Sequence, residues 1–398
     1  MTIEPPFSYS KRAARIKNSM IRDLLKLTSD PAFISFAGGL PFSDSFPIGP
    51  FSDILDRLLR DRPAVLQYSP TEGIAPLREW VAEKYRCDLP GLTADHLLIT
   101  HGSQQAFDLI GKLFIDEGSE IVIENPSYLG AIQSFNLFGA SYRPVGLDAD
   151  GVRTDELEAA LARPGALFFY AMPSFQNPTG STWTLARRKE AARLLDRHQT
   201  LLIEDNPYGE LWFDQPPPSS LMALRGLERT LLVISFSKSV APGLRIGAII
   251  GPKEIIRRLT QIKQSTDLHT NTLGQAVVAE FLASPGYREH LVKLRKQYQT
   301  AMEVMATALE KTICPHAVWN RPAGGMFFWC TLKGRFTAHD LLRETLLKKV
   351  AFIPGEEFAV APGLERALRL NYTYASHEKI REGIGLLQTC ADRLHFSS

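Results

Sequence analysis

Residues 235–247 contain the side chains whose types and spacing point most directly to chemistry. An apolar run at 231–234 is followed by hydroxyl groups and Lys238, and a Pro-Gly pair at 242–243 keeps the segment from forming a regular helix. A lysine at the end of an apolar strand, near the second cation Arg245, should have a lowered pKa. Its neutral amine would then be a nucleophile for an aldehyde. The alternative is a solvated surface lysine, which is what most lysines are.

The segments around this stretch alternate between strand and helix patterns. Short apolar runs are each followed by a turn or a helical pattern, and these runs lie at residues 97–100, 120–124, 166–170, 201–205, 231–235 and 246–250. Near-continuous apolar strands separated by helices predict an α/β fold with a mostly parallel central sheet and helices on both faces.

Polar residues follow several of these strands at their carboxyl ends. They are Ser103, Tyr128, Asn177, Asp205, Tyr208, Ser237 and Lys238. Because ligands of such sheets bind outside the carboxyl ends of the strands, one crevice could collect all seven. This convergence is the strongest indication of a site that the residue pattern gives.

The turn after the run at 97–100 has the pattern of an anion site. His101 and Gly102 are followed by Ser103 and Gln104 at the start of a helix. Free backbone N–H groups and the positive end of the helix dipole both favour an anion there. Ser103 could instead be a simple N-cap, which is its commoner role.

The chain beyond residue 288 changes character. A long helical pattern to about residue 309 precedes three strand patterns, and Arg369 lies in the last of them, at 367–371. This arginine could pair with an acid or present its guanidinium to a carboxylate, and the sequence leaves both open. We expect three parts: an N-terminal arm with part of a small domain (1–46), a large domain (47–287) and a small C-terminal α+β domain (288–398).

A pyridoxal phosphate cofactor would give the central residues defined roles. Asp205, an acid at a buried strand end, would keep the pyridine nitrogen protonated and make the ring an electron sink. Lys238 would bind the cofactor aldehyde and later act as general base. Arg369 would bind the substrate α-carboxylate through two parallel hydrogen bonds. Lys238, Asp205 and Tyr208 are therefore the expected catalytic residues.

The remaining polar residues would hold the cofactor ring and phosphate. Tyr208 and Asn177 would hydrogen-bond to the ring hydroxyl, with Asn177 also facing the substrate, and Tyr128 would stack on the ring. The phosphate would be bound by Ser103, Gln104, Ser235, Ser237 and Arg245. Taken singly, each residue has a commoner structural explanation, such as a core aromatic, a helix cap or a turn residue. Their occurrence together favours the cofactor.

The chain also resembles a known family. The motifs are Asn177-Pro178-Thr179-Gly180, Asp205-Asn206-Pro207-Tyr208, Ser235-Phe236-Ser237-Lys238 with Arg245, and Arg369-Leu370-Asn371. Their order and approximate spacing resemble those of fold-type I, class I/II aminotransferases. The segments 36–41 and 66–73 are similar to the subgroup that contains 2-aminoadipate, kynurenine and multi-substrate aminotransferases. The resemblance covers essentially the whole chain.

This resemblance implies further properties. It implies pyridoxal 5'-phosphate as cofactor, with pyridoxamine 5'-phosphate as its aminated form, and a homodimer with active sites at the interface. It implies that Tyr68 reaches the phosphate of the cofactor bound by the partner subunit. It also implies that the N-terminal segment, which has a basic helical pattern at 11–27, covers the substrate and brings Arg15 or Gly39 near it.

Composition and charge exclude several other classes. The formal net charge is only +2, which argues against a nucleic-acid surface or a polybasic membrane anchor. The four cysteines have no zinc-site spacing, so we expect no metal and interpret them as free thiols in a reducing compartment. The sequence shows no leader pattern and no membrane-spanning run, so we expect a cytoplasmic protein.

We therefore predict an aminotransferase that moves the α-amino group of an L-amino acid to a 2-oxo acid, with 2-oxoglutarate as the expected acceptor, by a ping-pong mechanism. One alternative is another pyridoxal-phosphate reaction on the same scaffold, such as elimination, cyclisation or oxidation in a specialised biosynthetic pathway. A cofactor-dependent transcription regulator is disfavoured, because the resemblance begins within the first few dozen residues and no basic excess supports DNA binding.

Overall fold

Eight strands form the central sheet of the protein. The structure is a computed structural model that describes residues 7–16, 20–28, 30–313 and 315–397. From one edge of the sheet to the other the strands are β2 (Leu97–Thr100), β9 (Gly247–Ile250), β8 (Thr230–Ser235), β7 (Leu201–Asn206), β6 (Ala166–Ala171), β3 (Glu120–Asn125), β4 (Ser141–Asp148) and β5 (Gly151–Val152). The strands from β8 to β4 pair in parallel, whereas β2, β9 and β5 pair antiparallel to their neighbours. The predicted α/β fold with a mostly parallel sheet is confirmed.

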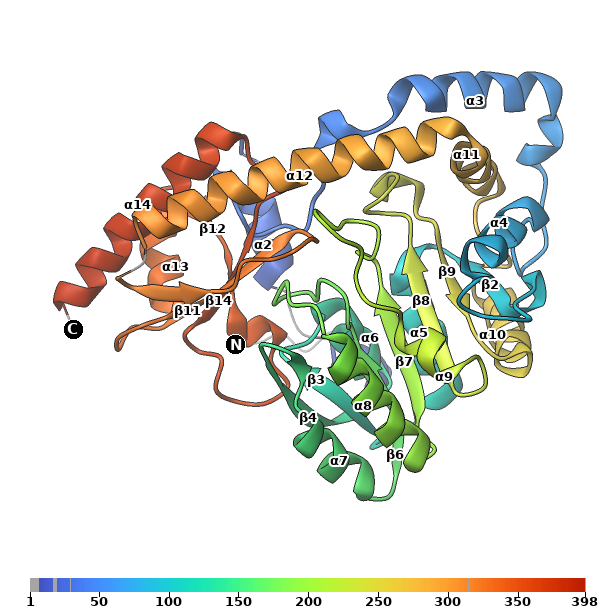
Figure 1. Ribbon diagram of the computed structural model, residues 1–398, viewed down its shortest axis with the longest axis horizontal. Helices are drawn as coiled ribbons and strands as arrows, with labels where there is room; N and C mark the ends of the chain where they lie inside the picture. Colours follow the sequence, from blue (N-terminus) through green and yellow to red (C-terminus); the bar gives the residue numbers. More distant parts are fainter. Residues whose placement is uncertain (1–6, 17–19, 29, 314, 398) are drawn as a thin grey trace.

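Both faces of this sheet are buried, because successive side chains of a strand point to opposite faces. In β6, Phe168 and Tyr170 join one apolar core, and Phe169 and Ala171 join another. The first core includes α5 (Gly102–Phe114), α6 (Leu129–Leu137) and α10 (Lys253–Thr266). The opposite face is covered by α3 (Ile48–Asp61), α4 (Ala75–Tyr85), α7 (Thr154–Ala162), α8 (Leu185–Arg197), α9 (Leu221–Arg225) and α11 (Thr272–Ala283). Figure 1 shows this layered arrangement.

A smaller antiparallel sheet forms the second part of the molecule. Its strands are, in order, β10 (Ala317–Trp319), β11 (Phe327–Leu332), β14 (Ala367–Asn371) and β13 (Ile353–Pro354). The helices of this part are α13 (Ala338–Leu347), α14 (His377–Ser397) and the distal end of α12 (Pro285–Lys311). Figure 1 shows α12 running from α11 to α14, so the domain boundary expected at 287/288 falls in its first turn.

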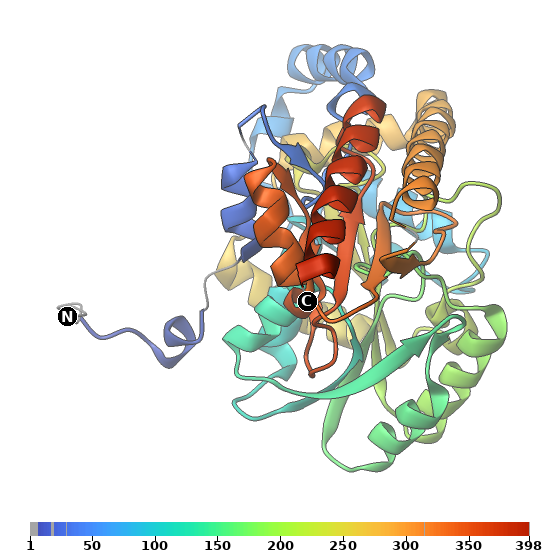
Figure 2. The same ribbon diagram turned by 90° about the vertical axis from the view of Figure 1, so that its left-hand side faces the viewer.

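The N-terminal segment contacts the small sheet region. β1 (Ile34–Ser35) pairs in parallel with β12 (Val350–Ala351). The helical pattern expected at 11–27 corresponds to two helices, α1 (Lys11–Ala14) and α2 (Met20–Leu27), and residues 17–19 between them lie outside the described residues. Figure 2 shows the N-terminal segment reaching out to one side, and α1 contacts the large part of the molecule through Arg12, which lies over the Phe138 ring, and through Arg15, which pairs with Glu117.

Two further observations hold for the described residues alone. No described helix has the length and apolar character needed to cross a membrane. Cys87, Cys330 and Cys390 are free thiols, and Cys314 lies outside the described part of the chain.

Candidate active site

A cavity of about 130 Å³ opens at the carboxyl ends of β7 and β8. Its lining consists of Ser103, Gln104, Tyr128, Met172, Asp205, Pro207, Tyr208, Ser235, Ser237, Lys238, Pro242 and Arg245. All the residues predicted to bind the cofactor line this cavity except Asn177 and Tyr68. The carboxyl ends of parallel strands meet at one edge of the sheet, which explains how residues far apart in sequence come together.

Lys238 follows β8 and its amine lies inside the cavity region. Its Nζ donates a hydrogen bond to the carbonyl oxygen of Gly39 at 2.7 Å, so the structure also brings Gly39 to this site. Burial, together with the nearby charges of Arg245 and Arg369, lowers the pKa of Lys238 to about 8. Roughly a tenth of this amine is therefore neutral at pH 7, far more than for an ordinary lysine, and the neutral form is the one that a nucleophile or general base requires.

Asp205 is the buried acid of the site. Its side chain is 1% exposed, its Oδ2 accepts a hydrogen bond from the Tyr170 hydroxyl at 2.8 Å, and its Oδ1 has no partner. Burial raises the pKa of Asp205 to about 7, although the Tyr170 hydrogen bond opposes that shift. A buried carboxylate oxygen without a hydrogen-bond donor is energetically unfavourable, so Asp205 Oδ1 is a candidate acceptor for a donor group of a bound ligand.

Tyr170 is a residue that the sequence reasoning missed. Its hydroxyl donates to one oxygen of Asp205 and leaves the other oxygen without a partner. The sequence signal for this role is a tyrosine near the carboxyl end of β6, the strand next to β7, which carries Asp205. Strand order, which the sequence did not provide, was needed to interpret it.

The anion end of the cavity is formed by the first turn of α5 together with Arg245. The Ser103 hydroxyl is buried without a partner. The Arg245 guanidinium donates to the Ser237 hydroxyl and to the His101 carbonyl oxygen, each at 3.4 Å. Among the described residues no acid forms an ion pair with Arg245. We call the first turn of α5 plus Arg245 the anion cradle.

Two residues of the anion cradle, Gly102 and Arg245, have left-handed backbone conformations. Gly102 has a φ of 68°, which favours glycine, and a Cβ at this position would lie 2.7 Å from Nη2 of Arg245, so a larger residue would displace that guanidinium. Arg245 itself has a φ of 56°, a conformation that costs roughly 1–3 kcal/mol for a residue other than glycine. The Gln104 amide donates to Gly130 and Ser134 of α6, so Gln104 offers the cavity its backbone N–H rather than its side chain.

Arg369 lies beside the cavity in β14 of the small sheet and is only 3% exposed. Its guanidinium donates to the Asn177 side-chain oxygen at 2.7 Å and to the Ala37 carbonyl oxygen at 2.5 Å, while its Nε has no partner. It stacks on the rings of Phe327 and Phe358, at 4.3 and 4.8 Å. Burial lowers the pKa of Arg369 to about 10, so it stays charged at neutral pH.

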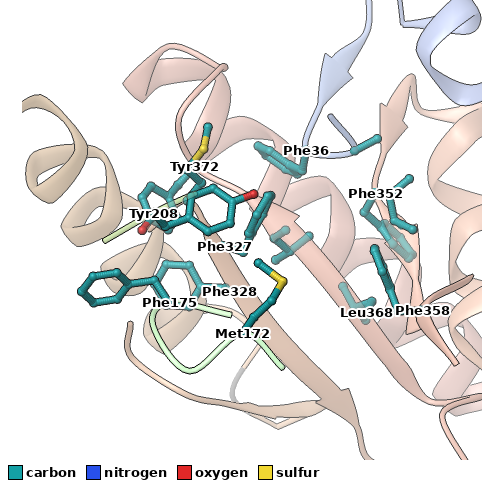
Figure 3. Close-up of a cluster of buried hydrophobic side chains, with 14 of the residues drawn as sticks. Phe36, Met172, Phe175, Tyr208, Phe327, Phe328, Phe352, Phe358, Leu368 and Tyr372 are labelled. Carbon is teal, nitrogen blue, oxygen red and sulfur yellow. The ribbon is translucent and has the colours of Figure 1, made fainter. Parts of the chain in front are cut away.

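These contacts bear on the two interpretations of Arg369 that the sequence left open. Its hydrogen-bond and ring contacts include no acid in the described part of the chain, so the pairing alternative finds no partner there. The rings of Phe327 and Phe358 belong to an apolar cluster that joins the two parts of the molecule, in which Phe327 packs against Tyr208 with ring centroids 5.9 Å apart (Figure 3). Arg369 is therefore a buried cation with donors directed to neutral oxygens.

Asn177 lies between the two parts, which explains why it does not line the cavity directly. Its oxygen accepts from Arg369, and its amide group donates to the Tyr208 hydroxyl at 3.4 Å. The peptide bond before Pro178 is cis. Burial raises the pKa of both Tyr208 and Tyr128, so both phenols stay protonated and can act as hydrogen-bond donors.

A buried acid holds the loop that carries Asn177. Glu124 of β3 accepts hydrogen bonds from the Met172 backbone N–H at 2.9 Å, the Trp183 indole at 3.2 Å and the Gln176 amide at 3.3 Å. Gln176 is the residue before Asn177, so these bonds fix the loop on both sides of it. The sequence reasoning also missed Glu124, which it treated only as the end of a strand.

Two predicted residues lie away from the cavity of the single chain. The Tyr68 ring is 77% exposed and packs edge-on against His269, with ring centroids 5.7 Å apart. Arg15 forms an ion pair with Glu117 at 2.5 Å, beyond the end of α5. The contact expected between Arg15 and a substrate therefore has no support from this arrangement.

The donor set of the cavity fits pyridoxal phosphate. Asp205 Oδ1 lacks a hydrogen-bond donor and suits a protonated pyridine nitrogen. The Ser103 hydroxyl and the Arg245 guanidinium, which has no acid partner among the described residues, suit a phosphate. Lys238 lies in the same cavity with a lowered pKa and suits an aldehyde. No cluster of three potential metal-ligating side chains is found in the described ranges.

Comparisons with known proteins agree with this site. The family model for aminotransferase class I and II matches residues 43–387. The chain is 42% identical to a 2-aminoadipate transaminase from Thermus thermophilus, covering 95% of this chain and 94% of the relative. It is 38% identical to an aromatic-amino-acid aminotransferase from Thermococcus litoralis, covering 94% of this chain and 92% of the relative.

A solved structure gives the same assignment. The structure of LysN, the α-aminoadipate aminotransferase of Thermus thermophilus in complex with N-(5'-phosphopyridoxyl)-L-leucine, matches with a TM-score of 0.92. The two proteins are 40% identical, and the match covers 98% of each chain. The fold and the site thus define a fold-type I enzyme with pyridoxal phosphate as its cofactor. The chain belongs to the class I and II aminotransferases and transfers an amino group from an amino acid to a 2-oxo acid.

Proposed function

We propose that this aminotransferase acts on L-amino acids by a ping-pong mechanism, with glutamate and 2-oxoglutarate as its common substrate pair. The observation that supports the site assignment is the pairing, in one cavity, of an amine of lowered pKa with a buried carboxylate oxygen that lacks a donor. When bound, pyridoxal phosphate supplies an aldehyde that accepts the amino group and a ring that withdraws electrons from the substrate Cα.

Lys238 has two tasks in this proposal. Its Nζ holds the cofactor aldehyde when no substrate is bound, and its freed amine then moves a proton away from the substrate Cα. The Gly39 carbonyl oxygen lies 2.7 Å from this amine and is positioned to orient it between these tasks. A pKa of about 8 suits a group that must both accept and release a proton near neutral pH.

Asp205, Tyr208 and Asn177 hold the cofactor ring. Asp205 Oδ1 would accept from the pyridine nitrogen, while Tyr170 keeps the carboxylate oriented through Oδ2. Tyr208 and Asn177 would donate to the ring hydroxyl, and Tyr128 would stack on the ring. The anion cradle, with Ser235 and Ser237, binds the phosphate.

Arg369 binds the substrate α-carboxylate. Its Nε has no partner, and its present hydrogen bonds go to neutral oxygens of Asn177 and Ala37, so it can exchange them for a charged acceptor. The rings of Phe327 and Phe358 lie 4.3 and 4.8 Å from the guanidinium carbon and help to hold this cation in place beside the cavity.

We infer that the enzyme works as a homodimer in the cytoplasm. The exposed ring of Tyr68 is available to a second subunit, which supports a role at the phosphate of the site in the partner subunit. The N-terminal arm extends from the molecule in Figure 2 and is expected to complete a substrate site only in that assembly. The names of the relatives place 2-aminoadipate and aromatic amino acids first in a panel of donors.

The half-reaction with glutamate tests this function. The absorption spectrum of the purified protein is recorded before and after adding L-glutamate, and 2-oxoglutarate is measured in the same sample. We expect the cofactor band to bleach while 2-oxoglutarate appears one-for-one with cofactor. A bleached band without oxo acid, accompanied by ammonia or peroxide, would instead assign elimination or oxidation. An unchanged spectrum would exclude glutamate as donor, and the panel of other amino acids would follow.

A further inference from the structure

A second cluster of polar groups lies behind the anion cradle, outside the cavity. It consists of His101, Gln105, Lys263 and Asp267, which we call the Asp267 cluster. His101 and Gln105 flank the cradle residues in sequence, whereas Lys263 and Asp267 belong to the end of α10. Lys263 is completely buried.

Asp267 is the centre of this cluster. It accepts hydrogen bonds from the Lys263 amine at 2.8 Å, the Gln105 amide at 2.6 Å and the His101 ring at 2.9 Å. Nε2 of His101 accepts from the Asn271 backbone N–H at 3.3 Å, so the ring proton is on Nδ1 and is donated to Asp267. The imidazole is thereby held in one tautomer and one orientation.

The cluster controls the backbone that enters the cradle. The His101 backbone N–H donates to the Gln105 side-chain oxygen at 2.8 Å, and that oxygen also accepts from Lys263 at 2.8 Å. The His101 carbonyl oxygen accepts from Arg245. The backbone N–H of His101 is therefore held by the Asp267 cluster, and its carbonyl oxygen is held by Arg245 of the anion cradle. These two bonds fix the backbone that leads into Gly102 and Ser103.

The turn that carries Asp267 is itself anchored to the sheet. The Thr270 hydroxyl donates to the Ile99 carbonyl oxygen of β2 at 3.2 Å, and the Gln275 amide donates to the Thr270 carbonyl oxygen at 2.8 Å. Thr270 and Gln275 are both fully buried. Asp267 therefore lies next to a segment that is hydrogen-bonded to the strand preceding the cradle.

We propose that Asp267 is a positioning residue for the anion cradle, which aims the first N–H groups of α5 and Arg245 at one phosphate. It acts through His101 and Gln105 and does not contact the ligand. This inference rests on the proposed binding of the cofactor phosphate at this end of the cavity. It predicts that loss of the Asp267 carboxylate weakens recognition of the phosphate group and leaves recognition of the ring intact.

The test compares two probes on the apoenzyme, pyridoxal 5'-phosphate and pyridoxal, which lacks the phosphate. The variant Asp267→Asn keeps the size of the side chain and removes its charge. We expect the Kd for pyridoxal phosphate to rise about tenfold, the loss that one charge-assisted hydrogen bond represents. The Kd for pyridoxal should change by less than about twofold, within the usual scatter of a distant substitution.

Two further variants keep the test decisive. Asp267→Asn leaves the Lys263 ammonium buried without its anion, a change that can prevent the single variant from folding. The double variant Lys263→Met/Asp267→Asn removes both charges. It should show the same selective loss of affinity for pyridoxal phosphate. Asp392→Asn breaks another His–Asp pair, with His316 at 2.6 Å in the small part of the molecule, and should change neither Kd. Equal losses for both probes, or no loss, would overturn the proposal.

Arg245→Gln separates this inference from the site assignment beneath it. If Arg245→Gln leaves the affinity for pyridoxal phosphate unchanged, the phosphate binds elsewhere and the assignment itself fails. If Arg245→Gln weakens that affinity while Asp267→Asn does not, only the positioning role of Asp267 fails.

Discussion

Two groups of buried or half-buried polar side chains lie on either side of the turn between β2 and α5, and they differ in how completely they are hydrogen-bonded. In the Asp267 cluster the side chains of His101, Gln105, Lys263 and Asp267 all bond to one another. In the cavity, Asp205 Oδ1 and the Ser103 hydroxyl have no partner. The same turn thus separates a saturated network from an unsaturated one.

This difference distinguishes a supporting network from a binding site. An unpaired buried polar atom costs free energy, and its cost is offset when a ligand supplies the missing partner. A saturated cluster offers nothing to a ligand and instead holds the backbone in place. Burial lowers the pKa of a lysine in each cluster, so this effect alone does not distinguish Lys238 from Lys263. The distinction is that Lys263 has an acid partner and Lys238 has only a carbonyl oxygen.

The largest effect is expected at Lys238. Lys238→Ala removes both the group that holds the cofactor aldehyde and the proton carrier, so kcat should fall by about 10³-fold or more while cofactor remains bound. Steady-state assays and a cofactor titration measure the two effects. The matched control is Lys263→Met, which removes the other buried lysine. At saturating cofactor it should keep turnover within about tenfold and lower the melting temperature instead. Near-normal turnover of Lys238→Ala would refute the mechanism.

A smaller effect is expected at Arg369. Arg369→Ala should raise KM for both the amino acid and the oxo acid by about 10- to 100-fold, because each charged hydrogen bond to the carboxylate contributes roughly 1.5–3 kcal/mol. Initial-rate measurements with both substrates separate KM from kcat. Arg143→Ala is the control, since Arg143 is also buried but bonds to carbonyl oxygens of α7 and its following turn. A loss of thermal stability in Arg369→Ala with unchanged KM would show a purely structural role.

The smallest effect concerns the pH dependence of apoenzyme stability. Burial raises the pKa of Asp205 to about 7 in the folded apoenzyme, above the usual 3.8, so between these values the folded state holds a proton that the unfolded state has lost. The contribution of Asp205 to the free energy of unfolding is therefore fully present below about pH 4 and is lost as the pH rises through about 7. Asp205→Asn does not titrate, so its melting temperature should exceed that of the wild type by a margin that grows over this range.

Melting curves of both apoenzymes at several pH values measure this margin. Addition of pyridoxal phosphate should reverse the order, because a bound cofactor supplies the missing donor to the ionised Asp205 of the wild type. A margin that stays constant with pH would mean that Asp205 Oδ1 is not an unsatisfied acceptor in the folded apoenzyme.

The sequence by itself determined the elements and most of the residues that line the cavity. The strand patterns at 97–100, 120–124 and 231–235 match β2, β3 and β8 to within a residue at each end. This succeeded because apolar periodicity and Gly or Pro punctuation are local signals. The lowered pKa of Lys238 was also predictable, since its strand end and the nearby Arg245 are close in sequence.

Only the tertiary structure decided which distant groups meet. Arg369 bonds to Asn177 and Ala37, Tyr170 to Asp205, and His101 to Asp267, and no local pattern encodes any of these pairs. Arg15, expected near the substrate, instead pairs with Glu117. Such contacts depend on strand order and on how helices pack across the sheet, because these set the distances between side chains that are far apart in the chain. Local sequence therefore specified the parts of this site, and packing specified their partners.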